Sequence, residues 1–361
     1  MDFHFNEEQL MFRDSVRALL ERDCTADVLR ELWADESGRS DGLWRGLAEL
    51  GLTGLLLAEE NGGLGMAEVD LVLALEESGR ACLPEPLVET VLAAAPLLET
   101  LAAGGGTAAS VAGKWLPRVA AGEARLALEH PANPCVADAH VAELLLLLAG
   151  DGSLHAVERA HVELTRQPCN DAARRLFTVD WKPGDDSLLA DAAGATRLLD
   201  AAFDRAAFGC AAQQLGIGQK LIDLAVDYAG QREQFGRAIG SFQAVKHHLA
   251  TAQVAVEFAR PVVYRAACSL ATGHTDAGLH VSQAKVMADE AALLAARTSL
   301  QVHGAIGYTW EVDLHAWMKR AWALEMNWGG SAWHRGRLAD AVLADVDNNP
   351  REGQLQLQGV N

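Results

Sequence analysis

Basic residues are scarce in this chain of 361 residues. It carries 30 Lys and Arg against 49 Asp and Glu, which gives a formal net charge of −19. A protein that binds nucleic acid needs a basic face to neutralise phosphates, so we expect no nucleic-acid partner. An acidic chain can still hold an anionic cofactor, but only through a few local Arg, Lys and backbone N–H groups.

Closely spaced cysteines and long apolar runs are also missing. The six cysteines are scattered between positions 24 and 268, and no two have CxxC spacing. We therefore expect neither a metal site nor a disulfide framework, and a reducing cytoplasm fits. The longest leucine run, Leu144 to Leu148, is far too short to cross a bilayer. Residues 1–8 are too acidic for a signal peptide, so we expect a cytoplasmic protein without a membrane partner.

Aromatic residues make up only 6% of the chain, whereas half of all residues are apolar. Ala and Leu supply much of that half, and they are the best helix formers. The composition therefore predicts a mostly α-helical protein with a sizeable core. The length allows one large domain or two to three small ones.

Residues 1–120 predict an N-terminal helical domain. Asn6 is a good N-cap, and Gln9 stands where a capping box places Glu or Gln. Further helices are expected at 41–50, 68–81 and 89–102. Residues 121–194 differ from the flanking regions, because prolines separate short segments there. Alternation in 176–181 predicts a half-buried strand and the run 144–148 a buried one. We expect a small central β domain there, either a barrel or a sandwich.

Residues 195–345 predict a C-terminal four-helix bundle. Nine apolar positions alternate in steps of three and four, a heptad pattern typical of near-antiparallel helix packing. They are Phe242, Val245, Leu249, Ala252, Val256, Ala259, Val263, Ala266 and Leu270. Pro261 lies within this run and should kink the helix. A second long helix is expected at 281–300, and 346–361 should form a loose polar tail.

The first segment with chemical potential is REQFGRAIGSFQ, residues 232–243, which connects two expected helices. Arg232 offers a planar fork suited to a diphosphate, and Phe235 offers a face for a planar heterocycle. The alternative is an ordinary interhelical turn. Arg232 would then be solvated, and Phe235 would pack onto the core.

The second segment is QVHGAIGY, residues 301–308, which ends an Ala-rich helix with small residues. Glycines allow a close approach of phosphate or adenine, and free N–H groups in such a turn can bind an anion. The alternative is a simple helix C-cap at Gly304. No strand precedes the segment, so it is not a Rossmann fingerprint.

Together the two segments resemble the signatures of the acyl-CoA dehydrogenase family. The first signature continues as IGSFQAVKH through residue 247. Three further segments match the family: EENGGLG at 59–65, KWLPR at 114–118 and WEVDLH at 310–315. The resemblance extends from Phe3 to about Leu343 and is much weaker between Leu126 and Asp171.

The resemblance implies the same three-part fold that the periodicity predicts. It also implies that FAD lies between two subunits, one holding the isoalloxazine ring and the other the pyrophosphate and adenine. Six residues, carried over by motif, would hold the FAD of a partner: Arg232, Gln234, Phe235, Gln301, Gly304 and Gly307. Ala305 stands where the family usually has a second glycine, which slightly tightens that approach. The implied further partners are an acyl-CoA substrate and an electron-transfer acceptor.

Two departures from the family pattern bear on activity. The β-domain segment that positions the flavin ring and the thioester is replaced by LEHPANP at 128–134. The catalytic carboxylate, which many members carry near the C-terminus, is replaced by Trp328, and Trp cannot accept a proton. Some members place the base earlier, and Asp204 is then the nearest candidate, although a charge at a helix start explains it too. Glu311 and Glu325 are expected to be solvated or paired.

Three interpretations remain open from the sequence. The first is a non-catalytic chain of a heteromeric acyl-CoA dehydrogenase, similar to those that act on sterol side chains, which completes the FAD site of a catalytic partner. The second is a homo-oligomeric dehydrogenase with a relocated base such as Asp204. The third is a helical homologue that has lost its flavin. The survival of Arg232 and Gln301 with their neighbours favours the first two, and Trp328 counts against the second.

Overall fold

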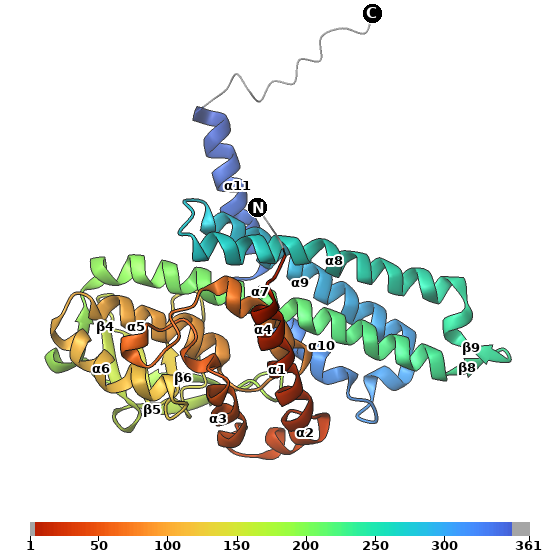
Figure 1. Ribbon diagram of the computed structural model, residues 1–361, viewed down its shortest axis with the longest axis horizontal. Coiled ribbons are helices and arrows are strands. Elements are labelled where there is room, and N and C mark those ends of the chain that lie inside the picture. The colour runs from red at the N-terminus through yellow and green to blue at the C-terminus, as the bar shows by residue number, and fades with distance from the viewer. Residues whose placement is uncertain (1–3, 349–361) are drawn as a thin grey trace, which may run out of the picture.

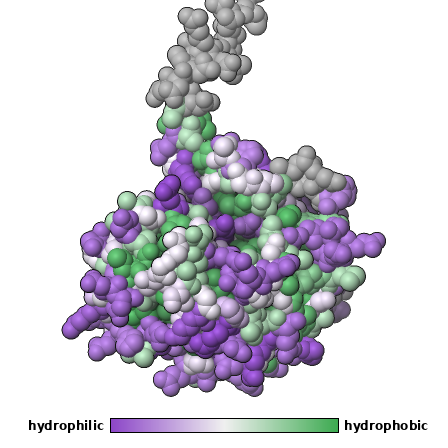
Figure 2. Space-filling view, turned by 60° about the vertical axis from the view of Figure 1, so that its left-hand side comes forward, coloured by the Kyte–Doolittle hydropathy of each residue, from purple (hydrophilic) through white to green (hydrophobic). Residues whose placement is uncertain are grey.

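The computed structural model describes residues 4–348 and is mostly helical, with a small β domain between two helical parts (Figure 1). This confirms the predicted fold class. Polar and charged side chains cover much of the face in Figure 2, with apolar patches between them. No helix within residues 4–348 is long and apolar enough to cross a membrane.

The N-terminal part contains only helices. Asn6 and Gln9 form the predicted capping box, because each side chain accepts from the backbone N–H of the other, at 2.8 Å and 3.0 Å. The helices are α1 (Glu7–Asp23), α2 (Ala26–Ala34), α3 (Asp41–Glu49), α4 (Glu68–Arg80), α5 (Ala95–Ala102) and α6 (Gly106–Ala120). Two 3₁₀ turns, η1 (Leu52–Gly54) and η2 (Glu59–Asn61), lie between α3 and α4.

One departure from the predicted helices concerns residues 89–102. The segment η3 (Val88–Ala94) is a π-helix that continues directly into α5. Short π-helical segments often mark functional sites, because the extra residue per turn changes where side chains point. The sequence periodicity predicts a plain α-helix here and gives no sign of the wider turn.

The central β domain consists of two small sheets that share a core. One sheet has the order β1-β3-β4-β7 and the other β2-β6-β5. The strands are β1 (Leu126–Leu128), β2 (Val136–Ala137), β3 (Leu144–Leu148), β4 (Leu154–Glu158), β5 (Glu163–Gln167), β6 (Leu176–Asp180) and β7 (Leu188–Ala190). Two 3₁₀ turns, η4 (Arg159–His161) and η5 (Asp185–Ser187), connect them. The predicted strands at 144–148 and 176–181 are therefore correct.

Successive residues along β1 and β3 contribute to two different hydrophobic cores, one on each face of the first sheet. Leu126, Leu144 and Leu146 belong to the large core shared with the helices. Ala127 and Leu145, one step along the same strands, belong to a second core shared with the other sheet. Successive side chains point to opposite faces of a strand, so the first sheet joins the helical parts to the rest of the β domain.

The C-terminal part is built on three long helices that reverse direction in turn. They are α7 (Ala192–Gln231), α8 (Gln243–Ala271) and α9 (Ala277–His303), followed by α10 (Leu314–Met326) and α11 (Ser331–Asn348). A two-stranded hairpin, β8 (Glu233–Gln234) and β9 (Arg237–Ala238), and the 3₁₀ turn η6 (Ile239–Ser241) join α7 to α8. The turn η7 (Gly304–Tyr308) follows α9. Because α7 and α9 run the same way, their C-terminal ends meet at one end of the bundle.

The heptad positions of α8 are buried from Ala252 to Ala266, whereas Phe242, Val245, Leu249 and Leu270 are half-buried. The helix passes through Pro261 as one continuous element. Glycines also allow α4 and α7 to approach closely, since a Cβ on Gly216 would lie 1.8 Å from the carbonyl oxygen of Glu76. The expected tail at 346–361 is partly wrong, because α11 continues to Asn348; residues 349–361 lie outside the described part.

Candidate functional site

A strained hairpin projects from the end of the bundle (Figure 1). β8 and β9 pair Gln234 with Arg237, which leaves a two-residue loop of Phe235 and Gly236. Both loop residues have positive φ angles, +54° and +75°. Such two-residue loops favour Asn-Gly or Gly, because a bulky side chain at positive φ is strained. Phe235 therefore holds a conformation that costs about 1–3 kcal/mol without a local reason for it.

The Phe235 side chain faces solvent. It is 92% exposed, and its contact within the chain is an edge-on approach to Phe242 at a centroid separation of 6.2 Å. Arg237 covers the Phe242 ring at 4.1 Å and supports the base of the hairpin. The alternative in which Phe235 packs onto the core is therefore wrong. The hairpin presents an aromatic face outward.

Arg232 stands at the root of the hairpin, directly after α7. Its backbone N–H caps the helix by donating to the Tyr228 carbonyl at 2.8 Å. Its side chain is exposed and forms no ion pair with any residue between 4 and 348. The Gln234 amide donates only to the Glu233 carbonyl, at 2.8 Å. The guanidinium is thus free to bind an anion from outside the chain.

The second segment forms an open turn at the end of α9. Gly304 caps the helix with φ +66°, and a Cβ there would meet no atom within 4 Å. Gly307 is buried, and a Cβ there would lie 2.9 Å from Leu300. Gln301 is exposed on the last turn of the helix. Gly304 is therefore a C-cap, as the alternative held, and it also leaves free space beside the backbone.

A ring stack joins the two segments. Tyr228 of α7 and His303 of α9 lie nearly parallel, with centroids 4.4 Å apart and an interplanar angle of 19°. Ser299 adds a second link by donating to the Leu221 carbonyl at 2.7 Å. The structure thus brings the ends of both motifs to one end of the bundle, as the resemblance implies.

Trp328 lies in the turn between α10 and α11, where the bundle meets the β domain. It has φ +54°, and only 1% of its surface is exposed. Its backbone N–H donates to Oδ1 of Asn133 at 3.0 Å. Its ring packs between His130 and Phe203, with centroids 5.3 Å and 6.4 Å away. The indole therefore fills the junction between the two parts.

His334 fixes the other side of this turn. Its Nε2 lies 3.0 Å from the Trp328 carbonyl oxygen and its Nδ1 lies 3.0 Å from the Ser282 hydroxyl. A carbonyl can only accept, so Nε2–H donates and Nδ1 accepts from Ser282. Burial lowers the pKa of His334 to about 4, so the ring is neutral at pH 7. Hydrogen bonds to the backbone N–H and to the carbonyl oxygen of Trp328 therefore both hold its strained conformation.

Asp204 lies in the middle of α7, away from the helix start where a dipole would explain it. Both of its carboxylate oxygens accept from Arg337 of α11, at 2.5 Å and 3.2 Å. A carboxylate in a two-point ion pair has its lone pairs engaged. Glu325 accepts from the Ser331 N–H at 3.2 Å, and Glu311 is exposed, in line with the expectation that they are paired or solvated.

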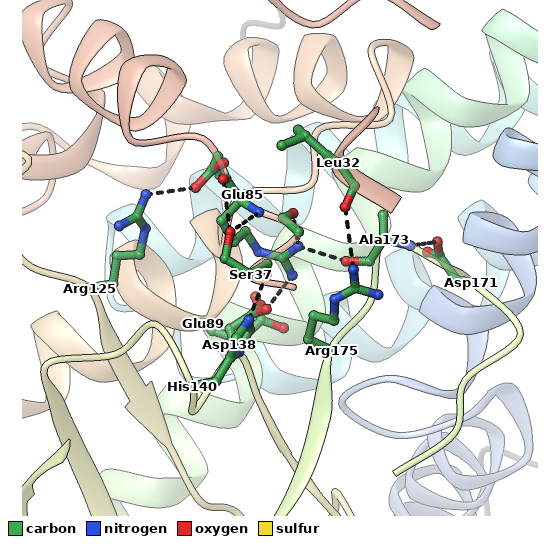
Figure 3. Close-up of polar contacts among 12 residues, drawn as sticks. Leu32, Ser37, Glu85, Glu89, Arg125, Asp138, His140, Asp171, Ala173 and Arg175 are labelled. Carbon is green, nitrogen blue, oxygen red and sulfur yellow. Dashed lines mark hydrogen bonds and ion pairs between the residues drawn. The ribbon is translucent and has the colours of Figure 1, made fainter. Parts of the chain in front are cut away.

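A buried ion network, which the sequence reasoning missed, lies among the N-terminal helices, the β domain and α10 (Figure 3). Arg125 donates to Glu85 at 3.1 Å, and Arg39 binds Asp138. Arg320 binds Asp171 and also donates to the Leu83 carbonyl at 2.7 Å. The three ion pairs join positions 40 to 149 apart, and Arg320 lies 237 positions from Leu83, so no local spacing could have revealed them. The network ties the N-terminal helices, the β domain and α10 together.

Glu89 is the carboxylate of this region that lies nearest the Trp328 turn. It projects from the π-helix η3 and accepts from the Asn327 amide at 3.4 Å. Burial raises its pKa, and the neighbouring Asp138 raises it further. The cavity that it lines with Asp138 and Arg174 measures about 40 Å³. That volume holds a water molecule but no organic substrate.

One group of residues elsewhere has metal-ligand chemistry: His274, Asp276 and His280, with ligand atoms within 4.8 Å of one another. Both ring nitrogens of His280 already have partners, Ser269 at 2.7 Å and Arg265 at 2.5 Å. Because Arg265 donates to the lone pair that a metal would need, the observed arrangement is a hydrogen-bonded turn between α8 and α9.

The chain matches two models of known families. Residues 6–123 match the N-terminal domain of acyl-CoA dehydrogenases, and residues 193–343 match the C-terminal domain. The two ranges leave 124–192 between them, which is the segment where the family pattern is weakest.

Individual relatives and solved structures are also similar to this chain. Acyl-CoA dehydrogenase IpdE2 of Mycolicibacterium smegmatis is 34% identical over 319 residues, covering 88% of this chain and 93% of the relative. The solved steroid ACAD Tcur3481-Tcur3483, as a G363A variant, superposes with a TM-score of 0.82 at 26% identity, covering 94% of this chain and 99% of that one. The ChsE4-ChsE5 complex from Mycobacterium tuberculosis shares the fold, with a TM-score of 0.81 at 23% identity over 95% and 99% of the two chains.

Proposed function

The chain belongs to the acyl-CoA dehydrogenase family, and we propose that it is the non-catalytic, FAD-binding chain of a heteromeric member. In this role it completes the FAD site of a catalytic partner chain. The assembled enzyme introduces an α,β double bond into an acyl-CoA thioester. Bound FAD would supply the hydride acceptor for that reaction, and an electron-transfer acceptor is the proposed further partner.

The observation that carries the proposal is the exposed and strained Phe235. In the isolated chain, Phe235 is unfavourable for two reasons. Its aromatic ring is exposed to solvent, and its bulky side chain stands on a backbone with positive φ. Both features are explained if the ring meets a planar group that another chain brings. Arg232 beside it is an unpaired cation of the right geometry for a pyrophosphate.

The residues of this end of the bundle fit the adenine and diphosphate half of FAD. Arg232 would hold the pyrophosphate, and Phe235 would cover the adenine. Gln301 supplies amide hydrogen bonds, while Gly304 leaves the space that a close approach needs. Gln234 and Gly307 complete the predicted set, Gln234 as a further amide and Gly307 by allowing the turn to pack closely.

The isoalloxazine half is proposed to lie in the catalytic partner chain. Trp328 fills the junction of bundle and β domain, and His130 and Phe203 close around its ring. The observed packing supports the view that this chain completes a neighbour's site and has no flavin-ring site of its own.

The candidate bases in this chain are poorly suited to remove a proton from a substrate. Asp204 is held by Arg337. Glu89 has a raised pKa, but it lies in a cavity of about 40 Å³ that cannot admit an acyl chain. A general base must lie within hydrogen-bond reach of the proton that it abstracts. These contacts favour a partner chain as the source of the catalytic carboxylate.

The nature of substrate and partner is proposed from the similar proteins. One solved relative is a steroid acyl-CoA dehydrogenase named for two chains, and another is a two-chain complex. A sterol side chain or fatty acid linked to coenzyme A is therefore the proposed substrate class. A heterotetramer of two catalytic and two non-catalytic chains is the proposed assembly, located in the cytoplasm.

Expression of the chain alone and together with candidate partner chains tests the proposal. We expect the yellow flavin spectrum and turnover only when a catalytic partner is present. Strong colour and turnover from this chain alone would instead establish a homo-oligomeric dehydrogenase with a relocated base. The absence of flavin in every combination would show that the chain is a flavin-free homologue.

A further inference from the structure

His303 lies where the two segments of the proposed FAD site meet. It is the last residue of α9 and directly precedes the open turn at Gly304. Only 8% of its surface is exposed, and its ring is stacked on Tyr228. Its Nδ1 lies 2.8 Å from the Ser299 carbonyl oxygen, one helical turn earlier. The ring plane and its rotation are therefore both fixed.

This geometry determines which ring nitrogen carries the proton. The Ser299 carbonyl can only accept, so Nδ1 must be the N–H donor. Burial lowers the pKa of His303, which keeps the ring neutral near pH 7. Nε2 then carries a lone pair and no proton, so it acts only as an acceptor.

Nε2 has no hydrogen-bond partner within residues 4–348, and it is not among the atoms sealed in the interior without one. A neutral histidine with one anchored nitrogen and one available acceptor is pre-organised to receive a donor from outside. Phosphate oxygens can only accept, so the group that Nε2 would bind is an N–H or O–H donor of the ligand.

We propose that His303 recognises the base of the dinucleotide by accepting a hydrogen bond from the 6-amino group of adenine. The inference rests on the proposed function, since it concerns the adenine end of the same site. It adds a specificity-determining residue to the six that the sequence motifs supply. Among those six, Arg232 would hold phosphate, Phe235 would cover the ring face and the glycines would leave space, and none of these contacts distinguishes adenine from another purine. The two glutamine amides each carry a donor and an acceptor, so they can pair with either purine.

The distinction follows from the chemistry of the purine 6-position. Adenine carries an amino group there, which donates to Nε2. Hypoxanthine and guanine carry a carbonyl oxygen, which would place an acceptor against an acceptor. A site built to hydrogen-bond one group discriminates strongly against an analogue that leaves a polar atom unpaired. Phe235 would stack on any of these bases with similar strength, so it contributes affinity without selectivity.

The test uses the apoprotein of the assembled enzyme with two ligands, FAD and its analogue in which hypoxanthine replaces adenine. Flavin fluorescence measures the affinity of each. We expect about tenfold or greater preference for FAD in the unmodified protein. Equal affinities for the two ligands would overturn the assignment of His303.

Variants separate recognition from packing. His303→Leu should reduce the preference to near unity, and His303→Gln should reduce it as well, because the amide can donate to hypoxanthine or accept from adenine. Tyr228→Phe preserves the ring stack and should leave the preference unchanged. A preference that survives in His303→Leu would contradict the proposal, and the ratio of affinities remains informative even if absolute affinity falls.

Failure of this inference and failure of the proposed function give different results. Arg232→Ala should weaken FAD and the analogue by the same factor, because both contain the pyrophosphate. If Arg232→Ala weakens both but the unmodified protein does not prefer FAD, only the role of His303 is wrong. If the assembled protein binds neither ligand, the proposed function itself is wrong.

Discussion

The backbone N–H of Trp328 donates to Oδ1 of Asn133 at 3.0 Å, across the boundary between the helical bundle and the β domain. The resemblance implies that Asn133 belongs to a β-domain segment that departs from the family pattern, and that Trp328 replaces the catalytic carboxylate of many members. The β-domain loop and the C-terminal turn pack against each other through this contact.

The first prediction concerns the anion-binding arginine. Arg232→Ala should reduce the affinity of the assembled enzyme for FAD about tenfold or more, because a charge-assisted contact contributes about 1.5–3 kcal/mol. Flavin content after gel filtration and titration of the apoprotein measure the effect. Arg45→Ala, which removes another exposed arginine on α3, is the control and should change neither quantity. Unchanged FAD affinity in Arg232→Ala would show that the guanidinium does not reach the cofactor.

The second prediction concerns the buried heptad of α8. Val256 is fully buried, so Val256→Asp should lower the free energy of unfolding by several kcal/mol or prevent folding, since it places an unpaired carboxylate in the core. Val254, two residues away, is 52% exposed, and Val254→Asp is the matched control for stability. Thermal melting of the two variants measures the difference in their stability. Equal melting temperatures would contradict the packing.

The same helix should also contribute to a subunit interface. Phe258 is 68% exposed on α8, and Phe258→Glu should weaken the assembly without changing the fold of the chain. Sedimentation velocity measures the oligomeric state, and circular dichroism reports the helix content. An oligomer that persists unchanged in Phe258→Glu would exclude this part of α8 from the interface.

These elements show what the sequence could predict. A heptad pattern located α8, and an apolar run and an alternating run located the strands at 144–148 and 176–181. The helix expected at 281–300 corresponds to α9. The family motifs predicted the two segments of the proposed FAD site, and the ring stack of Tyr228 on His303 joins these segments. His303 itself was not selected, because its role depends on a tautomer that only its contact with Ser299 reveals.

Other features depend on contacts between residues far apart in the chain. The pairing of Arg39 with Asp138 joins positions 99 residues apart, and neither position has a distinctive neighbourhood. The π-helix at Val88–Ala94 follows from packing and not from any local pattern. Asp204 is a candidate base because some family members place the base on the helix before the first signature, and no local pattern reveals its pairing with Arg337, 133 residues later.

The third prediction is a dependence of stability on pH. Burial lowers the pKa of His334 to about 4 from an ordinary value of 6.5. The folded chain therefore binds this proton less tightly than the unfolded chain. The contribution of His334 to stability is complete above about pH 6.5 and is lost as the pH falls toward 4, with a total of about 3 kcal/mol.

Replacing this histidine should flatten that dependence. Urea unfolding between pH 7 and pH 4 should show a smaller loss of stability in His334→Gln than in the unmodified chain. His140, whose pKa is also lowered to about 4 by burial, keeps its own share in both proteins. His161→Gln, at an exposed position, is the control. The account of His334 is wrong if its replacement leaves the slope unchanged.

The fourth prediction concerns the missing carboxylate. Trp328→Glu should not make this chain active by itself. The β-domain segment that orients the thioester in the family is absent, and the new carboxylate would be buried against His130 and Phe203. Steady-state assays of the variant chain without a partner measure the effect. Measurable acyl-CoA dehydrogenase turnover would mean that this chain retains a substrate site.

We propose that catalysis depends on a carboxylate of the partner chain and not on one of this chain. The most direct measurement compares kcat of the assembled enzyme carrying Asp204→Asn or Glu89→Gln in this chain with kcat after removal of the base in the co-purified partner. Asn and Gln keep the shape of the side chain and remove its basicity. The account predicts that both changes in this chain leave kcat within about a factor of ten, whereas the change in the partner lowers it by several orders of magnitude. A loss of several orders of magnitude in Asp204→Asn or Glu89→Gln, with flavin still bound, would show that this chain is catalytic in its own right.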